Sequence, residues 1–332
     1  RAGWTFVAPQ AVVLLLFVVV PMLMALWVSV SDWSGRGSPF SAGVNFVGLE
    51  NYDTVIGSDG LARTDLMTSL RNNFYYVLIV VPAQTLVALG LALVLNSPVL
   101  RLRGFFRTSF YFPAVTSSVA ISVVFIFLFT DSGSVNAVLG LVGIDGPAWL
   151  ADARGTLHLL LGAVGVSEPP AALAGTEVMG LSLWDWMAGP SVAMCTLIFL
   201  VTWVTIGPYK LMFLAALQDV PRELEEAATI DGASRWQTIR RVVVPSIRPT
   251  VVLVVTLGLI GTWQVFDQVY VISKGDPGKT TLTPAYLSYD QSFNATGTNH
   301  WGEGAAIAFL LFALIVVLAA LQRVLTRDRK DR

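Results

Sequence analysis

The chain has little charge: only 13% of its 332 residues are Asp, Glu, Lys or Arg, whereas 55% are hydrophobic. Soluble domains carry about a quarter charged residues, and the mean hydropathy here is +0.67. So few polar side chains cannot cover a water-soluble globular fold, and the same composition excludes intrinsic disorder. Because 21 basic residues nearly balance 22 acidic ones, bulk charge gives no case for nucleic acid as a partner.

Cysteine and histidine are equally scarce. Cys195 is the single cysteine, which excludes an intrachain disulfide and a cysteine-based metal cluster. His158 and His300 are too few and too isolated to suggest a metal site. The sequence also offers no Ser/His/Asp group typical of a membrane-embedded enzyme. We therefore expect neither catalytic residues nor metal ligands.

Long apolar runs are abundant instead. A helix that crosses the hydrocarbon core needs about 20 mostly apolar residues. Six runs qualify, at 8–30, 74–95, 110–129, 192–217, 251–272 and 305–321. The first is too long for the core of a signal peptide and no small-residue cleavage site follows it, so we expect it to be retained. The runs predict an all-α integral membrane protein that forms one transmembrane domain over residues 1–332.

A large soluble bundle of six buried helices is the alternative to this interpretation. Its helices would show polar stripes, which the stretches 14–20 and 251–255 do not. The lipid bilayer is therefore the expected surrounding of the chain, as a multi-pass protein.

The charges between the spans predict the orientation. Segments 96–109, 218–250 and 322–332 together with Arg1 hold 14 basic and 7 acidic residues, whereas 31–73, 130–191 and 273–304 hold 6 basic and 14 acidic residues. Cationic loops stay in the cytoplasm, so we expect both termini and the loop 218–250 there. The short apolar run 156–166 lies in the long external segment 130–191. It favours a surface or re-entrant helix, because a seventh crossing would place the basic tail outside.

The loop 218–250 predicts two short helices joined by a turn. Pro221 suits a first helical turn, and Glu223, Glu225 and Glu226 lie near that helix's positive end. Gly232 is a natural stop. Ser234 and Gln237 form a capping box that opens the second helix, and Pro245 limits its continuation. A solvated hairpin lying on the membrane would satisfy the same pattern.

The order of residues in this loop is more specific. Glu226-Ala227-Ala228, three residues, Gly232, nine residues and then Val242-x-Val244-Pro245 resembles the EAA loop of ABC-importer permease subunits. That family usually ends the motif with Ile-x-Leu-Pro. Elsewhere, the chain resembles the maltose and glycerol-phosphate type of permease, which imports carbohydrates, at residues 46–52, 107–113, 207–209, 217–221, 231–234, 266–270, 275–277 and 280. The external segment 152–183 is longer than in that group.

The resemblance implies a type I ABC-importer permease fold with six transmembrane helices, in the cell membrane (inner or plasma membrane) of a bacterium. It implies that the loop's first helix is a coupling helix, which docks on a separate ATPase. Glu226 would meet a basic residue of the ATPase, and Gly232 would allow the turn. The expected coupling set is Glu223, Glu226, Ala227, Ala228, Asp231, Gly232 and Pro245.

The same resemblance implies the partners. They are a second permease subunit, which would form a heterodimer with this chain, two ATPase subunits and an extracytoplasmic binding protein that delivers a sugar. Residues 273–280 nearly spell a P-loop, but Ser273 replaces its first glycine and the charge pattern places the segment outside. We therefore expect no cofactor on this chain and ATP with Mg²⁺ on the partner ATPase.

Two ionisable residues, Lys210 and Asp267, lie within predicted spans. Lys210 is about seven residues from the cytoplasmic end of its span, and we expect it to extend to the interface. On span five, Trp263, Asp267 and Tyr270 are spaced to share one helical face, with Gln264 and Gln268 beside them. Span four adds Trp203, Thr205 and Tyr209.

Hydrogen-bonding groups beside flat aromatic faces suit a neutral sugar, so these residues are candidates for the substrate pathway. Ordinary helix packing with polar contacts is the alternative. Two other functions remain open: an ABC permease for an amino acid, polyamine or phosphonate, and an ion-coupled secondary transporter. The latter would predict inverted repeats, and no clear repeat is seen.

Overall fold

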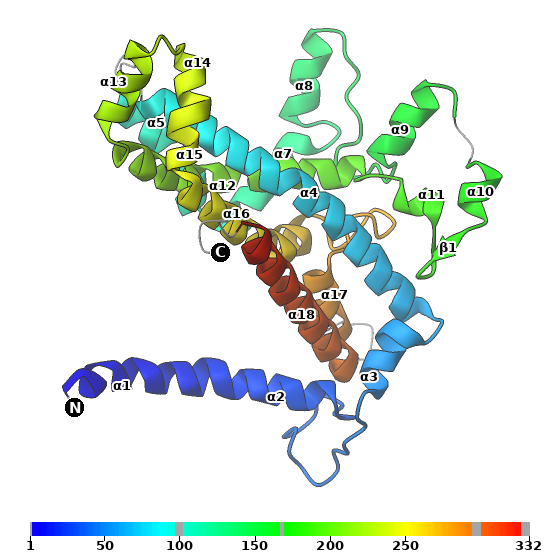
Figure 1. Ribbon diagram of the computed structural model, residues 1–332. Coiled ribbons are helices and arrows are strands. Elements are labelled where there is room, and N and C mark those ends of the chain that lie inside the picture. Colours follow the sequence, from blue (N-terminus) through cyan, green and yellow to red (C-terminus); the bar gives the residue numbers. More distant parts are fainter. Residues whose placement is uncertain (1, 97–101, 167–168, 294–299, 327–332) are drawn as a thin grey trace.

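The computed structural model describes residues 2–96, 102–166, 169–293 and 300–326, and it is mostly helical (Figure 1). The α-helices are α1 (Ala2–Leu14), α2 (Val20–Ser29), α3 (Glu50–Tyr52), α4 (Leu61–Asn96), α5 (Arg103–Ser109), α6 (Phe112–Val115), α7 (Ser118–Phe129), α8 (Ser134–Leu141), α9 (Thr156–Ala163), α10 (Ala171–Ala174), α11 (Leu183–Trp186), α12 (Val192–Gln218), α13 (Arg222–Ile230), α14 (Arg235–Thr238), α15 (Val244–Ser246), α16 (Arg248–Trp263), α17 (Pro284–Phe293) and α18 (Trp301–Thr326). The π-helical stretches are η1 (Leu15–Val19), η2 (Asp53–Gly57), η3 (Ile239–Val243) and η4 (Val269–Ser273). Strands β1 (Glu177–Val178) and β2 (Leu181–Ser182) form a small antiparallel hairpin.

Five helical segments are long and apolar enough to cross a membrane, and a sixth counts if the bent pair 235–246 and 248–263 is taken as one span. The helical fold class is thereby confirmed. Spans one, two, four and six correspond to α1–η1–α2, α4, α12 and α18. The basic tail 327–332 and Arg101, which enter the orientation prediction, lie outside the described residues.

The centre of the bundle is a stripe of small or neutral side chains on α4. Tyr76, Val80, Gln84, Ala88 and Ala92 recur every four residues, and each is fully buried. Successive members of this series lie one turn apart along a ridge that winds around α4, and α4 packs against α12 and α16. The side chains shrink to alanine toward the α5 end of α4, so the three helices approach each other closely there.

The third span differs from its prediction over 110–129. Pro113 lies in the first turn of the separate short helix α6, Thr116 has an extended backbone with ψ 144°, and α7 begins only at Ser118. The apolar stretch instead begins at Ser118 and runs through α7 and, after a turn at 130–133, the separate helix α8 to Leu141. The predicted boundaries are therefore wrong, because the apolar count ignored the break between Val115 and Ser118.

The fifth span is also interrupted. Helix α16 ends at Trp263, whereas the prediction continued the helix to 272, and a π-helical stretch, η4, follows from Val269. At the other end, α16 bends by 71° from the preceding helical segment 235–246. This bend lies at Ile247, two residues after Pro245. Pro245 lies within α15, which ends one residue later at Ser246, in agreement with the expected limit at this proline.

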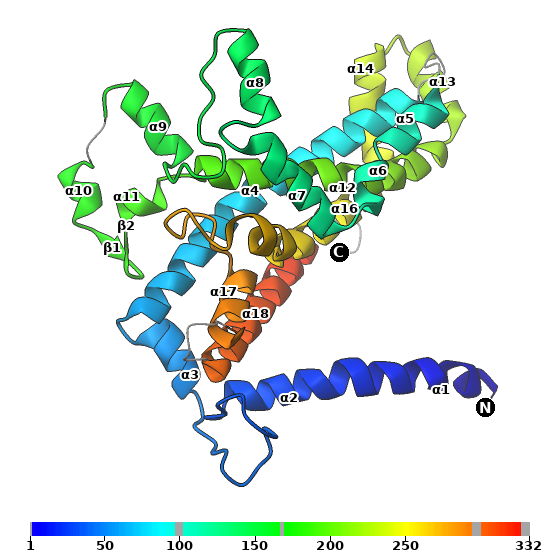
Figure 2. The ribbon, with the colours of Figure 1, turned by 180° about the vertical axis from the view of Figure 1, so that it is seen from behind.

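Two parts of the chain stand away from the bundle. The helix formed by α1, η1 and α2 extends from it, as both views show (Figures 1 and 2), and residues 6–23 on it are exposed. The segment 130–191 projects on the other side with α8 to α11 and the β-hairpin. Its run 156–166 forms only the eight-residue helix α9, as expected for a surface helix.

Candidate functional site

The 218–250 hairpin has the two helices that its sequence predicts. Helix α13 ends in two backbone hydrogen bonds, from the Gly232 amide to the Thr229 carbonyl at 3.0 Å and from the Ala233 amide to the Ala228 carbonyl at 2.9 Å. This is the Schellman arrangement, which needs a left-handed residue, and Gly232 supplies it with φ +78°.

The second helix of the hairpin starts with the predicted capping box. The Ser234 amide donates to Oε1 of Gln237 at 2.8 Å, and the Gln237 amide donates to Oγ of Ser234. These bonds satisfy the free amides at the start of α14. The turn between α13 and α14 is therefore fixed from both sides by the backbone.

The hairpin is anchored to the bundle through its second helix. Val243 and Ile247 are 5% and 3% exposed, and they pack in one apolar cluster with residues from α4 and α12, including Leu95, Phe213 and Leu217. A force on the hairpin would thus be transmitted to the ends of three long helices rather than absorbed by a loose loop.

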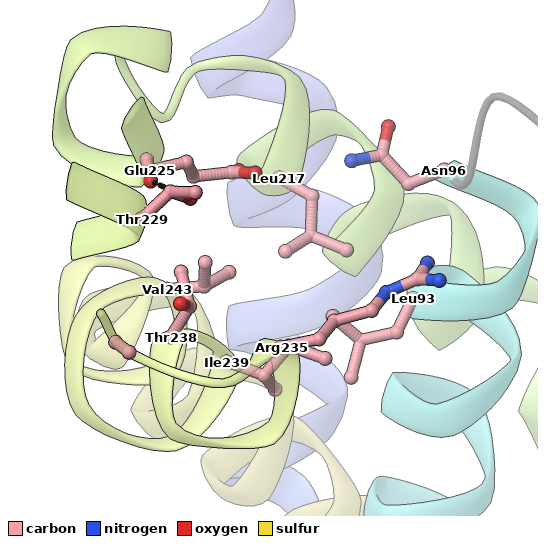
Figure 3. A pocket seen from close by; sticks show the side chains of 10 residues that line it. Leu93, Asn96, Leu217, Glu225, Thr229, Arg235, Thr238, Ile239 and Val243 are labelled. Carbon is pink, nitrogen blue, oxygen red and sulfur yellow. Dashed lines mark hydrogen bonds between the residues drawn. The ribbon is translucent and has the colours of Figure 1, made fainter. Parts of the chain in front are cut away.

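Between the hairpin and the helix ends lies a cavity of about 340 Å³, the hairpin cavity (Figure 3). Glu225 and Thr229 face it from α13, and Leu93 and Leu217 face it from α4 and α12. The first hairpin helix is therefore held off the bundle, whereas the second is packed onto it.

The predicted coupling residues lie mostly on the open side of the hairpin. Exposed positions in this set are Glu223, Glu226, Ala227, Asp231, Gly232 and Pro245, and Ala228 is half-buried. Three large apolar side chains are exposed beside them: Leu224 at 45%, Ile230 at 86% and Trp236 at 67%. Exposed apolar groups of this size, rimmed by acidic residues, are typical of a protein–protein contact.

A second cavity, of about 260 Å³, lies inside the bundle among α4, α12 and α16, and we call it the membrane cavity. Of the eight residues predicted for a substrate pathway, five line it: Thr205, Tyr209, Gln264, Asp267 and Gln268. Gln268 is further fixed by α7, since its Nε2 donates to Oγ of Ser118 at 3.1 Å. The structure thus gathers polar groups from two spans around one space.

The other three predicted residues lie elsewhere. Trp263 is 5% exposed in the core, the ring of Trp203 packs 5.6 Å from that of Phe125 on α7, and Tyr270 stacks on Phe266. The predicted shared face of Trp263, Asp267 and Tyr270 is wrong, because α16 ends at Trp263 and the chain turns before Asp267. Spacing rules hold only within an unbroken helix.

Tyr76 and Gln84 on α4 are among the lining residues of the membrane cavity that were missed from the sequence. Both are fully buried, and within the described part of the chain the Tyr76 hydroxyl and the Gln84 Nε2 have no hydrogen-bond partner. The Gln84 Oε1 accepts from the Thr205 hydroxyl at 2.8 Å. A glutamine inside an apolar run was the available signal, because an uncharged polar residue in a span needs a partner.

Lys210 does not reach the interface as expected. Its side chain is 0% exposed, and its Nζ donates to the carbonyl oxygen of Arg107 at 3.0 Å and lies 5.6 Å from the ring centroid of Phe110. The segment 107–111 covers it because Gly207 permits close approach: a Cβ at this position would lie 2.7 Å from the Phe110 carbonyl oxygen.

The P-loop-like segment 273–280 forms a tight turn. Its lysine, Lys279, is engaged by Asp65, with Nζ 2.6 Å and 2.8 Å from the two carboxylate oxygens. The turn is closed by the Asp276 amide, which donates to the Ser273 carbonyl at 2.9 Å. A lysine held in this way differs from the free phosphate-binding lysine of a P-loop.

Comparison with known proteins gives one family. The model of the family "Binding-protein-dependent transport system inner membrane component" matches residues 84–331. The lactose transport system permease protein LacF of Rhizobium radiobacter is 30% identical over 99% of this chain and 95% of its own length. The arabinooligosaccharides transport system permease protein AraP of Halalkalibacterium halodurans is 30% identical over 85% of this chain and 76% of its own.

Two solved structures share the fold. A chain of a bacterial ABC transporter involved in the import of the acidic polysaccharide alginate superposes with a TM-score of 0.72 at 18% identity, covering 98% of this chain and 95% of that one. A chain of the bacterial alginate ABC transporter in complex with an alginate pentasaccharide-bound periplasmic protein gives a TM-score of 0.69 at 19% identity. The predicted importer-permease fold is confirmed by this likeness.

Proposed function

The chain belongs to the family of binding-protein-dependent transport system inner membrane components, and from this premise we propose that it forms half of the translocation pathway of an ATP-driven sugar importer. The observation that carries the proposal is the link between an exposed hairpin and the membrane cavity. The hairpin is fixed by its own caps, and it is packed onto the helices that line the cavity. The chain performs no covalent chemistry in this role.

The hairpin is the proposed docking site of a separate ATPase. Its face combines acidic side chains with the exposed apolar residues Leu224, Ile230 and Trp236, so a complementary groove would be apolar with a basic rim. Glu226 would pair with a basic residue of that rim. ATP and Mg²⁺ bind to the ATPase, and this chain holds no cofactor.

The motion follows from the anchor. When the ATPase subunits close, α13 moves with them, and the rigid turn at Gly232 passes the displacement to the helical segment 235–246. The 71° bend at Ile247 separates this segment from α16, so a tilt of the hairpin alters the angle of α16 against α4 and α12. These three helices wall the membrane cavity. The result is a rigid-body switch of the cavity from one side of the membrane to the other.

The proposed cargo is an oligosaccharide or another sugar. The membrane cavity offers hydroxyl, amide and carboxylate groups with the aromatic rings of Tyr76, Tyr209 and Phe266, which is the mixture that a neutral polyol requires. The lactose and arabinooligosaccharide permeases named above support the same substrate class.

The remaining partners are a second permease subunit and a binding protein. The helix formed by α1, η1 and α2 stands alone with residues 6–23 exposed, and the membrane cavity is walled by helices of this chain. Both features favour a second permease subunit beside this one. We propose that it is a similar but not identical chain, so that the pair is a heterodimer. The projecting segment 130–191 offers a surface for the binding protein outside the membrane. Both termini and the hairpin would then lie on the cytoplasmic side of the bacterial cell membrane.

The test uses the complex purified with its native partners and reconstituted into vesicles. Uptake of labelled lactose, maltotriose and arabinotriose is measured together with ATP hydrolysis stimulated by the binding protein. Glu226→Lys should leave membrane insertion intact but abolish both uptake and stimulated hydrolysis. Glu50→Lys, a matched change of an exposed acid on α3, lies outside the hairpin and the segment 130–191 and should leave both unchanged.

Normal transport by Glu226→Lys would overturn the coupling role. Uptake of an amino acid, a polyamine or a phosphonate, with no sugar carried, would retain the permease and overturn the substrate class. Sugar transport in vesicles that contain no ATPase subunit would indicate an ion-coupled transporter instead.

A further inference from the structure

A continuous row of aromatic rings leads away from the membrane cavity, and we name it the aromatic ladder. It runs Phe266, Tyr270, Tyr289, Phe293, Trp301 and Trp33. Successive ring centroids are 5.4, 5.2, 5.1, 4.6 and 5.2 Å apart. Four of these rings come from the segment between α16 and α18, Trp301 begins α18, and Trp33 follows α2. Helix α17, which carries Tyr289 and Phe293, lies beside α18 (Figure 2).

The ladder joins two cavities. Its first ring, Phe266, lines the membrane cavity. Its last two rings, Trp301 and Trp33, line another cavity of about 230 Å³, the distal cavity, beside the ends of α2 and α18 that lie away from the hairpin. Ordinary packing of α17 would explain single ring contacts, but it does not require a row that ends in a cavity at each side.

The distal cavity is built as a polar site with an aromatic wall. Asp32, Asn51 and Glu303 line it with the two tryptophans. The indole Nε1 of Trp33 is buried, and among the described residues it has no hydrogen-bond partner.

The backbone supports this wall. A Cβ at Gly35 would lie 2.0 Å from Nε1 of Trp301, and Gly35 has φ +82°. The chain therefore needs glycine there to let the Trp301 ring approach. Asn51 is oriented by bonds from its Nδ2 to the carbonyls of Ser29 and Ser31, each at 3.0 Å.

Polar groups also flank the middle of the ladder. Tyr270 and Phe293 are 40% and 54% exposed, so part of each ring is left uncovered by the rest of this chain. Asp290 lies next to Tyr289 in sequence, and burial, followed by the charge of Asp65, raises its pKa. Flat aromatic faces beside hydrogen-bonding groups fit the C–H faces and the hydroxyls of a sugar ring. A lipid chain or a purely apolar partner would not need the acids at both ends.

We propose that the aromatic ladder is a sugar track, along which an oligosaccharide released outside passes from the distal cavity to the membrane cavity. The inference rests on the proposed function, since it assumes sugar import, and it adds a second sugar subsite at Trp33 and Trp301. The rings offer successive stacking positions of similar strength. The sugar can therefore move from ring to ring and does not have to dissociate from a single tight site.

The experiment uses the reconstituted complex with its binding protein and ATPase. Whichever of lactose, maltotriose and arabinotriose the unmodified complex imports is used as the probe. Tyr270→Leu and Phe293→Leu remove a ring and keep apolar bulk, whereas Tyr270→Phe and Phe293→Tyr keep the ring. Phe312→Leu on α18, where the ring is 56% exposed and outside the ladder, is the matched control.

Each leucine variant should lower the sugar imported per ATP hydrolysed by about two- to tenfold, the range that one lost aromatic contact allows. Stimulated ATP hydrolysis and recovery of the assembled complex should match those of Phe312→Leu, and the ring-keeping variants should behave as the unmodified complex. Uptake per ATP equal to that of the control would overturn the track, because the rings would then only pack.

A parallel loss of assembly or of stimulated hydrolysis would also overturn it, because the ladder would then be a contact for the second permease or the binding protein. If the unmodified complex imports no sugar of the panel, the proposed function fails, and the track fails with it. Failure of the proposed function is therefore recognised from the unmodified complex, whereas failure of the track alone is recognised from the leucine variants.

Discussion

The Nζ atom of Lys210 on α12 donates a hydrogen bond of 3.0 Å to the backbone carbonyl oxygen of Arg107 on α5. The ammonium group is fully buried, and this one carbonyl and the ring of Phe110 are the partners that the structure describes for it. A charge buried with so few partners costs several kcal/mol, whereas a hydrogen bond to a charged group returns about 1.5–3 kcal/mol. The lysine therefore positions α5 and α6 on α12 at the expense of stability.

We predict that Lys210→Met keeps or raises the melting temperature of the purified complex but slows transport, because the segment 107–111 is released from α12. Labelling of a cysteine placed at Thr108, in a chain with Cys195→Ala, should become faster. Lys274→Met, which removes an exposed lysine at the far end, is the control. A melting temperature clearly below that of the control would show that the buried lysine stabilises the fold.

The turn of the hairpin gives a second prediction. Gly232 has φ +78° and an added Cβ would meet nothing within 4 Å, so Gly232→Ala tests the backbone alone. A left-handed alanine costs about 1–2 kcal/mol, and we expect faster amide hydrogen exchange over 222–237 and weaker stimulation of the ATPase. Gly104→Ala on α5, which also meets nothing within 4 Å and has no positive φ, should change neither.

The hairpin was predictable because its signals are local. A capping box, a left-handed glycine and an acidic first turn act within four residues, and the structure has Ser234, Gln237 and Gly232 in these roles. Long helices such as α12 follow equally well from uninterrupted apolar runs.

The breaks in spans three and five were not predictable in this way. Hydropathy does not distinguish a helix from an extended residue such as Thr116. For the same reason it placed the end of the fifth helix after Trp263, where α16 in fact ends. The membrane cavity needs three helices at once, so Gln84 on α4 enters it through a contact with Thr205 that lies 121 residues away in sequence. Such contacts depend on packing and not on local pattern.

A third prediction concerns pH and the base of the projecting segment. The Asp152 side chain is 8% exposed and accepts hydrogen bonds from Nε and Nη2 of Arg154, at 3.0 Å and 2.6 Å. The bond to the Arg154 side chain is the main cause that lowers the pKa of Asp152 below its ordinary 3.8. The unfolded segment therefore binds more protons than the folded one just below pH 3.8.

The stabilisation from this pair is complete above the ordinary pKa and is lost as the pH falls through the lowered pKa of Asp152. Proteolysis within 130–191 should therefore accelerate on acidification through this range. The Asp152→Asn variant should lack that acid step, and the protease should cleave it faster at neutral pH. Asp131→Asn, at an exposed acid of the same segment, should keep the step. An unchanged acid step in Asp152→Asn would assign it to another group.

Gln84→Leu separates a substrate contact from a structural one. The change removes an Nε2 without a partner, and a buried group of this kind costs about 1–3 kcal/mol. It also removes the bond from Thr205, whose hydroxyl still donates to the Val201 carbonyl at 2.8 Å. Folding should therefore be unaffected or slightly favoured, and the melting temperature should not fall.

If Nε2 of Gln84 meets a sugar hydroxyl during transport, the loss of one neutral hydrogen bond should slow uptake by about two- to tenfold. Gln322→Leu on α18 is the control, because Nε2 of Gln322 donates to the Val252 carbonyl and the residue does not line the membrane cavity. Uptake at the control rate would exclude contact between Gln84 and the sugar. Slow uptake with a lower melting temperature would make the residue a packing element between α4 and α16. Gly258 lets α16 lie so close to Gln84 that a Cβ added there would be 2.3 Å from Nε2.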